Sequence, residues 1–103
     1  MKFLNFCMFD VAKGVDVAQA TDKFWASPSP GMKMLADYVC EGLPFPGALP
    51  NTMVGISIIE AESNEALAAL SYPLMLAGAS VWNVPVLEMP TGTGAEAEKK
   101  YRG

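Results

Sequence analysis

Five side chains that can hydrogen-bond or react fall at alternating positions of three apolar segments: Asn5, Cys7, Tyr38, Cys40 and Ser57. Alternate residues of a β-strand point to the same face of the sheet. If the segments are strands, these side chains form a polar patch on an otherwise apolar wall. Small-molecule pockets are built in that way, with a few convergent polar groups in an apolar lining. The pattern therefore makes Asn5, Cys7, Tyr38 and Ser57 candidate ligand-binding residues.

A purely structural role fits the same pattern. Asn5, Tyr38 and Ser57 can bond to one another or to a buried water, as buried polar groups commonly do. Trp82 is a candidate wall of the pocket, and Trp25 offers the same aromatic surface, but such residues more often belong to the core. The sequence does not fix which side of the last strand faces the helices, so Trp82 and Asn83 can exchange roles. These alternatives stay open at the level of sequence.

The residue inventory limits the chemistry that such a patch can perform. The chain has no histidine, which removes the commonest general base and most haem and zinc sites. Cys7 and Cys40 lack metal-ligand spacing, so we expect no metal and no cofactor. Asp37 is expected to be solvated. No catalytic residue stands out, and whether the chain is an enzyme is left open.

The two cysteines are predicted to be free thiols. They fall on the first and second strands, which the third strand separates, so their Cα atoms lie about 9–10 Å apart. A disulfide needs less than about 7 Å. With no neighbouring histidine or cation to lower the pKa of either thiol, a nucleophilic cysteine is not expected.

Composition indicates a single small domain that buries part of its surface against a partner. The chain has 103 residues, of which 51% are hydrophobic and only 17% charged, fewer charges than the usual quarter. The net charge is −4 and the basic residues are scattered, which argues against nucleic acid. There is no apolar run of about 18 residues for a membrane span. We interpret "MKFLNFCMFD" as a first strand rather than a signal peptide, which with the free thiols predicts a cytoplasmic protein.

Periodicity and breakers predict the order β-α-β-β-α-β. Strands are expected at 2–9, 32–41, 52–60 and 80–89, and helices at 14–25 and from Ser63 to near Gly78, with a kink or restart at Pro73. Pro85 favours an edge position for the last strand. The expected class is α+β, a ferredoxin-like four-stranded antiparallel sheet with two helices on one face. Residues 1–90 would form this domain and 91–103 a flexible tail or short helix.

Both faces of the predicted sheet are apolar. Leu4, Phe6 and Met8 share one face of the first strand, and Phe3, Asn5, Cys7 and Phe9 share the other. Core size favours the more uniform Phe6 face as the one packed on the helices, although the choice stays open. Two helices cover only one face, so the other requires a second protomer. The proline-rich loop 42–51, which carries Leu43, Phe45 and Leu49, is expected to reach over that partner.

The element order and three blocks of sequence resemble the dimeric α/β-barrel superfamily, in particular one of its small uncharacterised prokaryotic subfamilies. The blocks are "MKFLNF", "MVGISIIEAESNEALAAL" and "VWNVPVLEMP". The resemblance implies homodimers formed through sheet faces. It also implies a range of activities, since the superfamily includes cofactor-free monooxygenases, isomerases, haem-handling enzymes and proteins with no known activity. In these relatives the ligand often lies between sheet and helices.

Together these observations predict a homodimer that binds a small apolar or aromatic molecule, or that has a structural or interaction role. The alternative is a cofactor-independent monooxygenase or isomerase acting on an aromatic or quinone-like substrate. In that reading Asn5, Tyr38 and Ser57 orient the substrate and Trp82 forms a wall.

Overall fold

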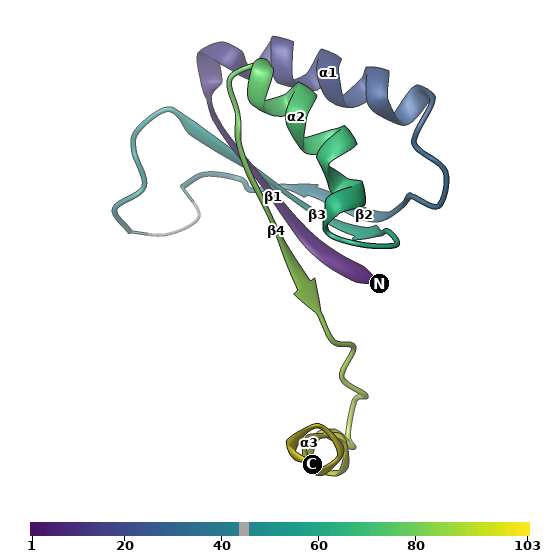
Figure 1. Cartoon of the computed structure of the whole chain (residues 1–103). Coiled ribbons are helices and arrows are strands. Elements are labelled where there is room, and N and C mark those ends of the chain that lie inside the picture. Colours follow the sequence, from purple (N-terminus) through teal and green to yellow (C-terminus); the bar gives the residue numbers. More distant parts are fainter. Residues whose placement is uncertain (44–45) are drawn as a thin grey trace.

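The computed structural model describes residues 1–43 and 46–103 (Figure 1). In chain order the elements are β1 (Lys2–Asp10), the 3-10 turn η1 (Val11–Lys13), α1 (Gly14–Ala26), β2 (Lys33–Val39), β3 (Thr52–Glu60), the 3-10 turn η2 (Glu65–Leu67), α2 (Ala68–Leu76), β4 (Ser80–Val86) and α3 (Gly94–Arg102). The α+β class and the four-stranded antiparallel sheet expected from the sequence are confirmed.

The strands lie in the order β2-β3-β1-β4, and each neighbouring pair is antiparallel. β1 and β2 therefore run parallel to each other on either side of β3, and α1 is the crossover between them. Figure 1 shows α1 and α2 over the same face of the sheet, with α3 well away from both layers. β4 pairs with β1 alone, so Pro85 lies on an edge strand, as expected. Among the described helices, none has the length and apolar character to cross a bilayer.

The helices cover the sheet face that carries Phe3, Asn5 and Cys7. Phe3, Ile59 and Leu67 are the largest fully buried side chains, and Val17 of α1 and Leu74 of α2 complete the core over them. The expectation that core size would place the Phe6 face against the helices was wrong. Phe3 and Ile59 lie opposite each other on β1 and β3 and supply enough apolar volume by themselves.

A β-bulge in β2 changes which side chains share this covered face. Met34 lies opposite Ile59, but the register shifts between Met34 and Ala36, so Asp37 rather than Ala36 lies opposite Ser57. One extra residue in a strand turns every later side chain to the other face. The prediction that Tyr38 shares a face with Asn5 and Ser57 was therefore wrong. Tyr38 lies opposite Ile56, on the uncovered face.

The second helical segment has well-defined ends. The Ser63 hydroxyl accepts a hydrogen bond from the Ala66 N–H at 3.1 Å, as expected for a capping residue. α2 then runs through Pro73, so the restart expected there does not occur. It ends as predicted near Gly78, where the N–H groups of Gly78 and Ala79 donate to the carbonyls of Met75 and Leu74, each at 3.0 Å. Gly78 has φ +107°, a conformation open mainly to glycine.

Replacing Gly78 with alanine should destabilise the domain. The new Cβ would meet Cγ of Lys13 at 3.2 Å while φ is unfavourable for an L-residue. We expect a loss of about 1–2 kcal/mol in the free energy of unfolding, measured by denaturation followed by circular dichroism. Gly94→Ala is the matched control, because nothing lies within 4 Å of its added Cβ. Equal stability of the Gly78→Ala variant and the control would contradict this description of the helix end.

Candidate functional site

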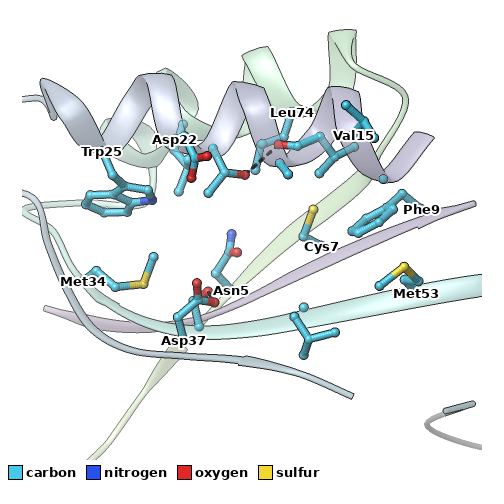
Figure 2. Close-up of a pocket in the computed structure, with 18 of the residues that line it drawn as sticks. Asn5, Cys7, Phe9, Val15, Asp22, Trp25, Met34, Asp37, Met53 and Leu74 are labelled. Atoms are coloured by element: carbon cyan, nitrogen blue, oxygen red, sulfur yellow. Dashed lines mark hydrogen bonds between the residues drawn. The ribbon is translucent and has the colours of Figure 1, made fainter. Parts of the chain in front are cut away.

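A cleft of about 470 Å³ lies between α1 and the sheet (Figure 2). Its floor is formed by β1, β3 and β2, and its roof by α1, which contributes Val17, Thr21 and Trp25. Leu70 and Leu74 of α2 also line it. The volume is within the range of about 300–1,000 Å³ that small-molecule pockets occupy.

The cleft is mainly apolar and open to solvent. Its apolar lining includes Phe9, Met34 and Met53. Val15 of α1 and Val39 of β2 also line it, although they are 70% and 59% exposed. A molecule can therefore enter from solvent without any rearrangement of the buried core.

A row of polar side chains crosses the covered face of the sheet beneath the helices. The four strands contribute Asp37, Ser57, Asn5 and Asn83 at neighbouring register positions. The Ser57 hydroxyl donates to a carboxylate oxygen of Asp37 at 2.8 Å, and Nδ2 of Asn5 donates to Oδ1 of Asn83 at 2.7 Å. Nδ2 of Asn83 in turn donates to the Ser71 hydroxyl of α2 at 3.2 Å.

This row combines a structural role with free binding capacity. Asn5 and Ser57 are 3% and 7% exposed, and buried polar groups need such partners. The bonds described use one amide hydrogen of Asn5 and the hydroxyl hydrogen of Ser57. Acceptor capacity remains on both side chains, and both line the cleft.

Trp25 places a hydrogen-bond donor on the opposite wall. Its ring packs edge-to-face on Phe24, with centroids 4.9 Å apart at 90°. Within residues 1–43 and 46–103, the buried Nε1 of Trp25 has no hydrogen-bond acceptor. Figure 2 shows the indole nitrogen directed toward the middle of the cleft, with Asn5 and Asp37 on the sheet side of the same space. Because buried indole N–H groups usually have a partner, Trp25 is suited to bind an acceptor atom of a ligand.

The charged groups of the cleft are all of one sign. Asp22 of α1 and Asp37 of β2 line it, and the described lining contains no Lys or Arg. The chain as a whole has no histidine. The cleft is therefore an electrostatically unfavourable place for an anion.

The surroundings of Cys7 disfavour its thiolate form. Burial, and to a smaller extent the negative charge of Asp37, raises the pKa of Cys7 from 9.0 to about 11. At this pKa the thiol is protonated at neutral pH. Both Cys7 and Cys40 are free. Within the described ranges, no group of three or more His, Cys, Asp or Glu residues is arranged to hold a metal ion.

The structure brings together three of the five residues predicted to bind a ligand. Asn5, Cys7 and Ser57 line the cleft, whereas Tyr38 and Trp82 do not. Trp82 lies opposite Phe6 on the uncovered face and stacks on it, with ring centroids 5.2 Å apart and planes at 13°. The prediction that Trp82 forms a wall of the same pocket was therefore wrong.

Sequence reasoning missed Asp37, Asp22 and Thr21 as lining residues and left Trp25 undecided. Asp37 is exposed, as expected, but it also bonds to Ser57 at the edge of the cleft. No feature of the sequence predicts the β-bulge that places Asp37 beside Ser57. Thr21 and Trp25 are spaced four residues apart, which places them on one helix face, and that spacing could have identified the roof.

The raised pKa predicts slow alkylation of Cys7. In a Cys40→Ala variant at pH 8, Cys7 should hold about a hundredfold less thiolate in the folded than in the unfolded chain. Iodoacetamide labelling with and without denaturant, followed by mass spectrometry, measures this difference. Comparable rates in the two states would contradict it. Because the folded pKa lies above the unfolded one, the thiol's contribution to stability is complete below pH 9 and declines as the pH rises toward about 11.

Comparison with protein-family models gave no match for this chain, and comparison with curated proteins gave none either. The assignment of a function therefore depends on the geometry of the cleft and of the uncovered sheet face.

Proposed function

We propose that this chain forms a homodimer of ferredoxin-like protomers, of the dimeric α/β-barrel type, and that each protomer binds a small apolar or aromatic molecule between α1 and the sheet. The observation that carries the binding function is the solvent-accessible apolar cleft of about 470 Å³, with polar groups on opposing walls. The two free thiols suit the reducing cytoplasm in which we expect the protein to work.

The polar groups support a ligand-binding role over simple imperfect packing. Asn5 and Ser57 retain acceptor capacity on the floor, and Trp25 presents a donor from the roof. Empty cavities in proteins are lined by apolar groups, whereas this space also has polar groups in its lining. Here donor and acceptors face one space, which is the arrangement that orients a ligand.

The uncovered sheet face supports dimerisation with a second copy of the chain. Two rows of uncharged side chains cross it from edge to edge: Tyr38, Ile56, Phe6 and Trp82, and beside them Ala36, Ile58, Leu4 and Val84. Tyr38 is 64% exposed and Trp82 is 41% exposed. The two rows themselves carry no charge, although Lys2 and Glu60 lie on the same face at one end of the strands. The middle of the face can therefore meet an identical face without like-charge repulsion, as a two-fold interface requires.

The loop between β2 and β3 was expected to extend this interface. Leu43 and Leu49 are 55% and 75% exposed, which is consistent with a role as contact residues for a partner. Phe45, together with Pro44, lies outside the described residues. Its contribution to the dimer remains part of the proposal.

A specific reaction is not part of the proposed function. The monooxygenase or isomerase hypothesis placed Asn5, Tyr38 and Ser57 around one substrate, with Trp82 as a wall. In the protomer Tyr38 and Trp82 are on the opposite side of the sheet from Asn5 and Ser57. That catalytic arrangement is therefore not assembled within one cleft.

Native mass spectrometry of freshly purified protein tests the binding function. We expect the mass of two protomers plus a small molecule that denaturation releases. Ala18→Phe should abolish the added mass, because Ala18 lines the cleft and a phenyl ring there fills it. Gln19→Phe, the next residue on α1 and not part of the lining, should retain it. Added mass that survives Ala18→Phe would place the ligand elsewhere.

The dimer is tested by placing a charge on the uncovered face. Tyr38→Asp should convert the dimer to a monomer at micromolar concentration in sedimentation velocity, because two carboxylates would be buried in a two-fold contact. Tyr72→Asp is the matched control, since Tyr72 is 61% exposed but on α2, over the other face. A Tyr38→Asp variant that stays dimeric would overturn the proposed interface.

A further inference from the structure

We infer that the cleft selects an uncharged aromatic molecule with a hydroxyl group and rejects the corresponding carboxylate. The inference rests on the proposed binding function and adds the chemical class of the ligand. Three features of the cleft carry it: the negative sign of both its charged side chains, the complementary hydrogen-bonding groups on its two walls, and the small residues in its lining.

Charge excludes anionic ligands. Asp37 on the floor and Asp22 on the roof line the cleft, and no basic side chain of the described residues lines it. The carboxylate of a ligand entering from solvent would lose hydration and gain no cationic partner. Both the lost hydration and the repulsion from Asp22 and Asp37 oppose its binding.

Hydrogen bonding favours a group that both accepts and donates. Trp25 Nε1–H can only donate, whereas the carboxylate of Asp37 can only accept. Asn5 contributes a further acceptor from the floor. A phenolic hydroxyl satisfies both walls, because its oxygen accepts from the indole while its hydrogen is donated to an acceptor on the sheet. The oxygen of an ether or a ketone can accept a hydrogen bond from Trp25, but it has no hydrogen to donate to the sheet.

Two small lining residues leave room for an aromatic ring. Gly55 on β3 has no side chain, and a Cβ built there would have only backbone atoms within 4 Å, at 3.7 Å and 3.9 Å. Ala18 on α1 is the small residue of the roof. The surrounding Phe9, Met34 and Met53 provide an apolar and adaptable wall, as thioether side chains do.

The test compares 2-naphthol with 2-naphthoate, two probes with the same ring system. The chain has two tryptophans, so its indole ¹⁵N–¹H spectrum should show two Nε1–H signals, one from the cleft and one from the uncovered face. A Trp82→Phe variant assigns them. Titration with 2-naphthol should shift the Trp25 signal downfield, and its apparent affinity should exceed that of 2-naphthoate by at least about tenfold.

Charge-neutral variants identify the cause of that selectivity. In the double variant Asp22→Asn with Asp37→Asn, 2-naphthoate should bind more tightly, and the ratio of the two affinities should fall to about threefold or less. Asp16→Asn is the control, because Asp16 is an exposed acid of the same helix that does not line the cleft. It should leave the ratio unchanged.

The outcomes distinguish selection by charge from ligand binding in the cleft. Equal or tighter binding of 2-naphthoate, with the Trp25 signal shifting, would overturn the charge selection while leaving the binding function intact. A ratio unchanged by the double variant would likewise overturn it. If neither probe moves the Trp25 signal, or if only the Trp82 signal moves, the inference fails together with the proposed cleft.

Discussion

A four-stranded sheet has two faces, and in the described chain the helices cover only one of them. Both faces carry apolar side chains. Burying such surface stabilises a protein by roughly 25 cal/mol for each Å² removed from water. This constraint divides the molecule into a covered side, where a cleft remains under α1, and an uncovered side, where Tyr38 and Trp82 are exposed and which we propose a second copy covers. Each strand serves both sides, since Asn5 and Phe6, or Asp37 and Tyr38, are adjacent residues facing opposite ways.

The cleft can be understood as the result of a conflict on the covered side. Apolar contact favours the packing of α1 onto β2 and β3, as Val17 and Phe24 pack on the core. Complete closure would bury the carboxylates of Asp22 and Asp37 with no cationic partner in the lining, at a cost of several kcal/mol per charge. An open cleft keeps them hydrated. It also leaves Trp25 Nε1 without a hydrogen-bond acceptor among the described residues.

Much of the fold follows from the sequence because the signals are local. Alternation defines β1 and β3, proline marks the edge strand β4, and Ser63 and Gly78 mark the ends of the second helical segment. The site was only partly predictable. Asn5, Cys7 and Ser57 lie on strands without a bulge and keep their alternation, whereas the bulge before Ala36 exchanges Tyr38 for Asp37 beside Ser57. The choice of the covered face was not predictable either, because both sets of alternating residues in β1 and β3 are mainly apolar.

A crystal structure of the complex with 2-naphthol tests the central claim most directly. We expect the ring between Gly55 and Ala18, with its oxygen within hydrogen-bond distance of Trp25 Nε1 and of an acceptor on the sheet. A ligand found only against Tyr38 and Trp82 on the uncovered face would contradict it. So would a structure in which α1 packs directly on β2 and β3 and leaves no space beneath Trp25.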